Sequence, residues 1–296
     1  MPAAVLVLSF ITAGNPVSEP QTELWQVAPD TCQKPWVVPE KPSEKTRAVV
    51  LLHGLYLHPL RPAKATQPWM RPWQLPKSGL VKTLAAEFDV FALGYSQVVS
   101  VDETAEAPGL RTAVEQLRKA GYTDVVLVGH SAGGLIAKRF VEVCPNAGVT
   151  RVITVAAPYV GVEAANLGLG YRKVQAPFVE SLTPSARIGA TKANKFPLGN
   201  EIEIVCVVCK LKHLETDGLV KVRSQWPEEL QQRGVPAVLT LVNHFEVMDD
   251  ADTAKTILKL AKGKLTRWSP EEVEAARKVL FGEHTAHGAF FHRQAK

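Results

Sequence analysis

The chain has 296 residues, of which 46% are hydrophobic and 21% are charged, and its formal net charge at pH 7 is +5. This composition excludes an intrinsically disordered protein, and the length suffices for one large α/β domain or two small ones with a sizeable core. Lysine and arginine are spread along the chain without a basic block, so the charge does not indicate a nucleic-acid partner.

The N-terminus carries an apolar run from Ala3 to Ala13 that is too short to span a bilayer. The run matches the hydrophobic region of a secretory leader, with Thr12 and Gly14 near a plausible cleavage site, although no positive charge precedes it. The alternative is an N-terminal strand or a loose apolar arm. We expect residues 1–20 to be a leader and the protein to be exported, to the periplasm or the medium; without a leader it would be cytoplasmic.

After a proline-rich lead-in over residues 21–45, with one expected strand at 22–28, short apolar strands alternate with helical patterns. Further strands are expected at 47–54, 89–95, 124–130, 151–158, 201–209 and 237–244. Helices are expected at 78–88, 108–120, 131–143 and 250–261. This alternation predicts an α/β fold over residues 46–265, with a mostly parallel central sheet and helices on both faces.

Two long segments interrupt the alternation: residues 55–77, rich in proline, and residues 159–200, rich in glycine and alanine. Loops this long in a compact domain usually cover or line a binding site. We expect 159–200 to be a cap-like or lid-like insertion. Residues 266–296 are expected to add a terminal helix, which begins with the capping box Ser269 to Glu272, and a loose tail.

Cys206 and Cys209 form a C-x-x-C pair inside the apolar run EIEIVCVVC. In a strand their side chains point to opposite faces, which separates them. A redox pair needs a helix N-terminus, and a zinc site needs a second pair, and the sequence shows neither. We therefore predict two core cysteines, and we find no acidic cluster dense enough for a calcium site.

The stretch Gly129-His130-Ser131-Ala132-Gly133 fits G-x-S-x-G at the point where an apolar strand becomes a helix. Such a turn forces the serine into strained dihedral angles, and its flanking glycines have no Cβ to collide with neighbouring elements. The helix N-terminus supplies free N–H groups and a positive dipole end. The motif predicts that Ser131 is a nucleophile; the alternative is a serine N-cap on a buried helix.

A serine nucleophile needs a histidine base, and the histidine needs an acid that orients it. In folds that place G-x-S-x-G between a strand and a helix, these residues follow in the chain order serine, acid, histidine. Asp217 is the one aspartate between Ser131 and His244 and follows a predicted strand in a polar turn; Glu215 is the competing acid. His244 follows the last predicted strand, whereas His213 breaks the order and the remaining histidines lie in the tail. We predict Ser131, Asp217 and His244 as the catalytic residues.

An oxyanion hole needs two N–H donors, one from the residue after the nucleophile and one from the loop after the first core strand. These positions are Ala132 and Leu55, and Gly54 lets the backbone turn inward. We expect His53 to be structural, with its ring hydrogen-bonded to this loop.

Three aromatic residues in the interrupting segments are candidates for substrate binding: Trp69, Trp73 and Tyr159. The two tryptophans would line an apolar acyl pocket together with the 159–200 segment. Packing beneath a long loop is an equal alternative for them.

The segments VVLLHGL, VVLVGHSAGG, VITVAAPYVG, and TDGLV followed by NHFEV resemble the α/β-hydrolase superfamily, and within it bacterial triacylglycerol lipases and related esterases. The resemblance covers about residues 46–262. AAPYVG lacks the histidine of the corresponding lipase segment, Thr-Pro-His-x-Gly, which weakens any transfer of substrate contacts. The resemblance implies hydrolysis of a small-molecule or lipid ester without a cofactor, with transient contact with a lipid surface.

The predicted function is therefore a serine carboxylic-ester hydrolase. An esterase is slightly favoured over an interfacial lipase, because the 159–200 segment has only a modest apolar face. Since one fold hosts many reactions, a thioesterase or amidase using the same residues is an alternative, and so is a non-catalytic binding protein that keeps the fold.

Overall fold

The computed structural model describes residues 19–29, 43–58, 61–167, 173–195, 198–199 and 201–282. The expected leader lies outside the described residues except for its last two positions, and the tail lies outside them beyond Gly282.

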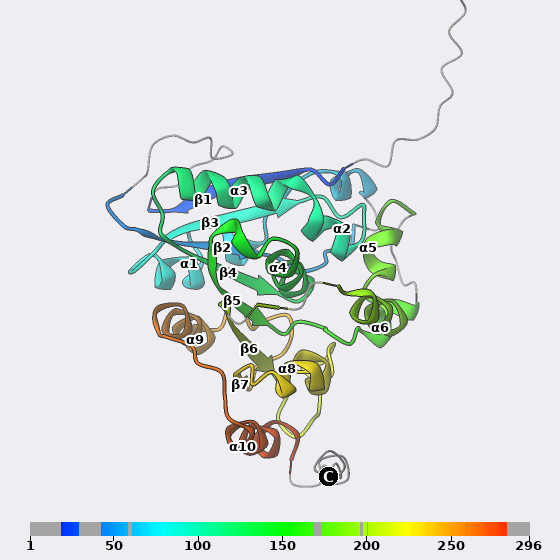
Figure 1. Ribbon diagram of the computed structural model, residues 1–296. Helices are drawn as coiled ribbons and strands as arrows, with labels where there is room; N and C mark the ends of the chain where they lie inside the picture. The colour runs from blue at the N-terminus through cyan, green and yellow to red at the C-terminus, as the bar shows by residue number, and fades with distance from the viewer. Residues whose placement is uncertain are drawn as a thin grey trace, which may run out of the picture.

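A seven-stranded sheet with the order β1-β3-β2-β4-β5-β6-β7 forms the centre of the described structure (Figure 1). All neighbours from β3 to β7 pair in parallel, and β1 pairs antiparallel with β3 at one edge. The strands are β1 (Thr22–Ala28), β2 (Arg47–Leu52), β3 (Asp89–Tyr95), β4 (Asp124–His130), β5 (Val149–Val155), β6 (Glu203–Cys209) and β7 (Ala237–Thr240). The predicted α/β fold with a mostly parallel sheet is confirmed.

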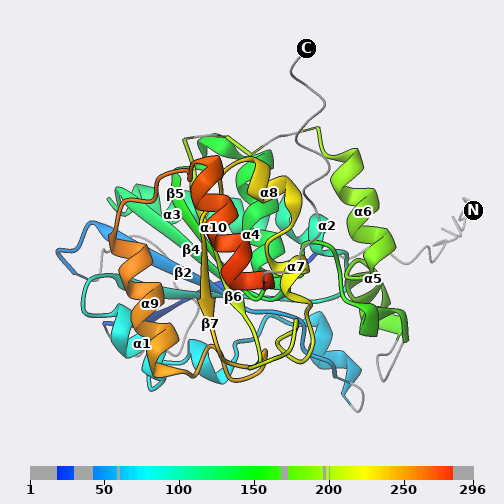
Figure 2. The same cartoon turned by 90° about the horizontal axis from the view of Figure 1, so that it is seen from below.

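Helices lie on both faces of this sheet (Figures 1 and 2). The α-helices are α1 (Gly79–Leu84), α2 (Val101–Glu106), α3 (Pro108–Lys119), α4 (Ala132–Val143), α5 (Ala176–Glu180), α6 (Pro184–Ala193), α7 (Val222–Gln225), α8 (Glu228–Gln232), α9 (Ala251–Lys262) and α10 (Pro270–Phe281). Short 3-10 turns are η1 (Pro62–Thr66), η2 (Pro72–Gln74), η3 (Pro145–Ala147), η4 (Glu163–Leu167) and η5 (Lys173–Gln175). None of the helices in the described ranges combines the length and the apolar character that a membrane crossing requires.

The alternation of side chains along each strand divides the core into two clusters. Val50 and Leu52 of β2 join a cluster with α3, α4 and α10, whereas Val49 and Leu51 join a second cluster with α1 and α9. Both faces of the parallel strands are therefore buried, which explains why their sequences are continuously apolar rather than alternating.

The two cysteines of the C-x-x-C pair follow the same rule. Both are buried, and Cys206 belongs to one core cluster while Cys209 belongs to the other. Burial raises the pKa of the Cys206 thiol to about 11, which keeps it protonated and unreactive near neutral pH. The prediction of core cysteines is confirmed.

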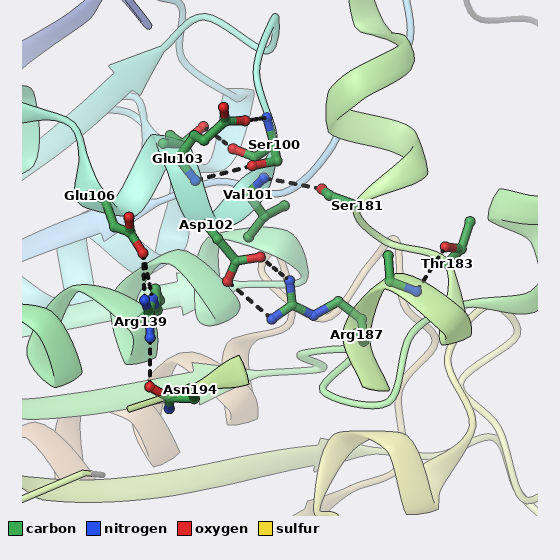
Figure 3. Close-up of polar contacts among 12 residues, drawn as sticks. Ser100, Val101, Asp102, Glu103, Glu106, Arg139, Ser181, Thr183, Arg187 and Asn194 are labelled. Carbon is green, nitrogen blue, oxygen red and sulfur yellow. Dashed lines mark hydrogen bonds and ion pairs between the residues drawn. The ribbon is translucent and has the colours of Figure 1, made fainter. Parts of the chain in front are cut away.

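Residues from the insertion dock onto α2 and α4, which are elements of the main fold (Figure 3). The guanidinium of Arg187 on α6 donates to both carboxylate oxygens of Asp102 on α2, at 2.6 and 3.3 Å. The Ser181 hydroxyl, which follows α5, accepts a hydrogen bond of 3.0 Å from the N–H of Val101. These contacts hold α5 and α6 together beside α2, as both overall views show.

Glycine at position 129 permits the close approach of β4 and α4. A Cβ there would lie 2.3 Å from the carbonyl oxygen of Gly133 and 2.6 Å from the nitrogen of Gly134, closer than real Cβ atoms come. Gly189, inside α6, offers a matched control because a Cβ there meets nothing within 4 Å.

We predict that Gly129→Ala lowers the free energy of unfolding by about 1–3 kcal/mol, because the strand and helix must move apart. Gly189→Ala should raise it by about 0.5–1 kcal/mol, because alanine is the better helix former. Urea denaturation of the two variants measures both changes, and a Gly129→Ala protein as stable as the wild type would contradict the packing argument.

Candidate active site

Ser131 lies at the junction of β4 and α4 in a strained backbone conformation, with φ 54° and ψ −125°. A positive φ is uncommon for a residue with a Cβ and persists only where the surroundings enforce it. Here the Ser131 N–H donates to the Val155 carbonyl at 2.8 Å, which ties the turn to the end of β5. The turn therefore presents the serine side chain at the carboxyl edge of the sheet.

The three predicted catalytic side chains form one hydrogen-bonded series. The Nε2 atom of His244 lies 3.1 Å from the Oγ of Ser131, and its Nδ1 lies 2.7 Å from the Oδ2 of Asp217. All three residues are buried, with Asp217 fully so. With a proton on Nδ1, the other ring nitrogen accepts the serine proton, which is the arrangement that a general base requires.

The structure brings Asp217, and not Glu215, to His244; Glu215 is exposed. One carboxylate oxygen of Asp217 accepts hydrogen bonds from the N–H groups of Leu219 at 2.9 Å and Val220 at 2.7 Å. The carbonyl oxygen of Asp217 also accepts from the His244 N–H at 2.9 Å. These bonds fix the carboxylate and hold the loop after β6 against the loop after β7.

His130, for which the sequence predicts no role, contacts His244. Its Nε2 lies 3.0 Å from the His244 carbonyl oxygen, and the two rings are 4.9 Å apart. Burial and the neighbouring His244 hold the pKa of the His130 imidazole well below its usual value, so the ring is neutral. The sequence feature that could have indicated a role for His130 is its position directly before Ser131 in the G-x-S-x-G motif.

The loop after β2 approaches Ser131 closely. A Cβ at Gly54 would lie 2.6 Å from the Cβ of Ser131, so glycine is required at this point. Within the described part of the chain, the N–H groups of Leu55 and Ala132 donate no hydrogen bond. The hydrogen bond expected for the His53 ring is present, between Nδ1 and the Gly54 carbonyl at 2.8 Å.

The structure separates the three candidates for substrate binding. Trp73 belongs to the core, where it is 5% exposed and meets the His130 ring edge-on. Tyr159 lines a cavity of about 330 Å³ beneath α6, and its hydroxyl donates to Thr154. Trp69 packs on Tyr56, with ring centroids 4.5 Å apart, beside the loop that carries Leu55. Contact of these residues with a substrate stays a prediction.

Several large apolar side chains that lie near Leu55 or His244 in the sequence are exposed. The sequence alone predicts no role for them. Phe245 directly follows His244 and is 72% exposed, and Leu241 is 61% exposed. Tyr56 and Leu57, which follow Leu55, are also exposed. We call these four residues the apolar rim. Among the residues that the structure describes, no group of His, Cys, Asp and Glu is arranged to hold a metal ion.

Burial of His53 has a consequence for stability. The ring is fully buried, and burial lowers the pKa of its imidazole from 6.5 to about 4. Between these two values the unfolded chain binds a proton that the folded protein does not. The free energy of unfolding therefore falls as the pH falls from about 6.5 to about 4, by up to about 1.4 kcal/mol per pH unit for this group.

We predict that His53→Asn, which keeps a donor near the Nδ1 position, removes this pH dependence. The stability advantage of the wild type over the variant should shrink as the pH is lowered from 7 to 4, in urea denaturation at each pH. A difference that stays constant over this range would show that His53 is not held neutral by burial.

Solved structures with a similar fold include three bacterial or metagenomic enzymes. The mature form of a Bacillus licheniformis lipase is 15% identical, with a TM-score of 0.56, and the alignment covers 84% of this chain and 99% of that one. A metagenomic carboxyl esterase is 15% identical, with a TM-score of 0.52 and coverage of 86% and 83%. A Legionella pneumophila phospholipase is 12% identical, with a TM-score of 0.55 and coverage of 79% and 63%.

At these identities the solved structures show a shared fold. No curated protein sequence matches the chain significantly. The sequence profile of the alpha/beta hydrolase family, however, matches residues 49–293, which is most of the chain. Together with the parallel sheet and the serine at the β4–α4 turn, this match shows that the chain belongs to the alpha/beta hydrolase family.

Proposed function

We propose that this protein is a serine hydrolase that cleaves carboxylic esters through an acyl-enzyme on Ser131. The observation that carries the proposal is the series of hydrogen bonds from Asp217 through His244 to Ser131. Support comes from the N–H groups of Leu55 and Ala132 on the neighbouring backbone, which have no acceptor among the residues that the structure describes. This set supplies a nucleophile, a base, an orienting acid and two donors for an oxyanion.

In the proposed mechanism, His244 accepts the Ser131 hydroxyl proton while the serine oxygen attacks the ester carbonyl carbon. Asp217 keeps the proton on Nδ1 and stabilises the imidazolium that forms. The N–H groups of Leu55 and Ala132 stabilise the oxyanion of the tetrahedral intermediate, by about 3 kcal/mol for each donor. The alcohol leaves with the proton from His244, and water then cleaves the acyl-enzyme with the same base.

The apolar rim supports a substrate with an apolar acyl group, either a small-molecule ester or a lipid ester. The similar structures of a lipase and of a carboxyl esterase agree with this substrate class. We favour an esterase, and exposed Phe245 is the specific observation in favour of a lipase, because it offers an apolar contact to a lipid surface beside the base.

We predict that Ser131→Ala lowers kcat for p-nitrophenyl esters by at least about 10³-fold, because the nucleophile is lost. Asp217→Asn should lower kcat by about 10³–10⁴-fold, because the amide favours the wrong tautomer of His244. Fluorophosphonate labelling followed by mass spectrometry should locate the label on Ser131. Thermal unfolding of each variant controls for folding.

The same assay separates the alternatives. A wild type that neither takes the label nor hydrolyses any ester from C2 to C16 would contradict the proposal and favour a binding protein. Labelling of Ser131 without ester hydrolysis, but with cleavage of an acyl thioester or an acyl anilide, would favour a thioesterase or an amidase.

For the lipase alternative, we predict the effect of Phe245→Ser on a tributyrin emulsion. If the rim contacts lipid, activity on the emulsion should fall about 10-fold to 100-fold, because burial of a phenylalanine contributes about 1.5–3 kcal/mol. Activity on soluble p-nitrophenyl acetate should change little. Val279→Ser on α10 is the matched control, because Val279 is 65% exposed and remote in sequence from the site. Equal activity of both variants on the emulsion would exclude a lipid contact by Phe245.

A further inference from the structure

Several carbonyl groups of the loop after β2 accept hydrogen bonds from side chains that come from elsewhere in the chain. Four successive carbonyl oxygens, from residue 53 to residue 56, accept such hydrogen bonds. The donors are the Tyr95 hydroxyl to His53, Gln97 Nε2 to Gly54 at 3.0 Å, Arg71 Nη2 to Leu55 at 2.9 Å, and Gln175 Nε2 to Tyr56 at 2.8 Å. This is a dense set of restraints for a short loop that forms no regular secondary structure.

Gln97 holds both peptide units that flank Leu55. Its Nε2 donates to the Gly54 carbonyl, and its Oε1 accepts from the Tyr56 N–H at 3.0 Å. The Gly54 carbonyl and the Leu55 N–H belong to one planar peptide unit, so they point in opposite directions. A hydrogen bond that fixes the Gly54 carbonyl therefore also fixes the direction of the Leu55 N–H.

Gln175 holds the next two peptide units in the same way. Its Nε2 donates to the Tyr56 carbonyl, and its Oε1 accepts from the His58 N–H at 3.0 Å. Its Nε2 also lies 3.4 Å from the Oε1 of Gln97, which links the two amides. Both glutamine side chains are fully buried, and a buried amide that lost these partners would remain unsatisfied.

Gln175 belongs to the insertion, at the end of η5 and directly before α5. The contacts of Ser181 with Val101 and of Arg187 with Asp102 dock this insertion on α2 (Figure 3). The insertion therefore reaches the loop next to the nucleophile through one side chain, about 120 residues away in sequence from the groups that it binds.

We propose that Gln97 and Gln175 are positioning residues that hold the Leu55 N–H toward the oxyanion. The inference rests on the proposed function. Gln97, together with the His53 ring that also binds the Gly54 carbonyl, restrains rotation of the Gly54–Leu55 peptide, which would turn a carbonyl oxygen toward the oxyanion in place of the N–H. Gln175 connects the loop that carries Leu55 to the insertion. Docking of the insertion on α2 therefore helps to hold the Leu55 N–H in place for the transition state.

The test replaces each glutamine by methionine, which keeps the length of the side chain and removes its hydrogen bonds. Gln231→Met is the matched control, because Gln231 is also buried and donates to a carbonyl, that of Trp226, but belongs to α8. For each protein, kcat and KM are measured with a soluble p-nitrophenyl ester. Inhibition is measured with an alkyl trifluoromethyl ketone, which adds to a serine and forms an oxyanion.

Gln97→Met should lower kcat about 10-fold to 100-fold with KM changed less than about threefold, since misdirection of one oxyanion donor acts on the transition state. Gln175→Met should have a smaller effect of the same kind, about 3-fold to 30-fold. The inhibition constant of the ketone should rise by the same factor by which kcat/KM falls. Gln231→Met should change kcat less than about twofold, even if it lowers the melting temperature as much as the other two substitutions do.

If Gln97→Met does not fold, Gln97→Glu serves instead, because it keeps the acceptor for the Tyr56 N–H and loses the donor to Gly54. A folded variant of Gln97 with the kcat and ketone affinity of the Gln231→Met control would overturn the proposal while leaving the hydrolase function intact. A wild type without hydrolysis and without reaction with the ketone would overturn the proposed function, and this role of the glutamines with it.

Discussion

The site depends on one local constraint, the strained turn that holds Ser131 at φ 54° between β4 and α4. The conformation is unfavourable in isolation, so it is maintained by the packing around it. Gly129 lets the helix begin directly against the strand, and a hydrogen bond from the Ser131 N–H to Val155 fixes the turn on β5. The position of the Ala132 N–H, which has no acceptor within the described ranges, and that of the Ser131 hydroxyl both follow from this geometry.

The parallel sheet then determines what can reach the serine. The carboxyl ends of parallel strands lie at one edge, so the loops after β2, β6 and β7 converge on the turn after β4. These loops carry Leu55, Asp217 and His244. Their backbones also bind each other, because the His244 N–H donates to the Asp217 carbonyl. The site is therefore assembled from segments that are far apart in sequence but adjacent at one edge of the sheet.

The sequence predicted the parts of this arrangement that have a local signal. The buried strands are continuous apolar runs in the sequence, so the sheet could be inferred from them. The glycines of the β4–α4 turn indicated Ser131, and the order of the remaining aspartate and histidine along the chain then indicated Asp217 and His244. α2 and α5 to α8 were missed because helices of four to ten residues carry too little periodicity. Gln97 and Gln175 were missed because a buried amide has no sequence pattern, and its partners lie 41 to 119 residues away. The sequence around Trp73 does not distinguish a residue that lines a pocket from one that packs in the core. The structure places Trp73 in the core.

The proposed mechanism requires that a carbonyl substrate reacts with Ser131 while its oxygen binds the N–H groups of Leu55 and Ala132. The most direct measurement is a crystal structure of the protein after reaction with an alkyl fluorophosphonate. The proposed mechanism predicts a bond from phosphorus to the Ser131 Oγ, with the phosphoryl oxygen within hydrogen-bond distance, about 2.7–3.2 Å, of both backbone nitrogens. An adduct on another residue, or a phosphoryl oxygen that points away from both N–H groups, would contradict it.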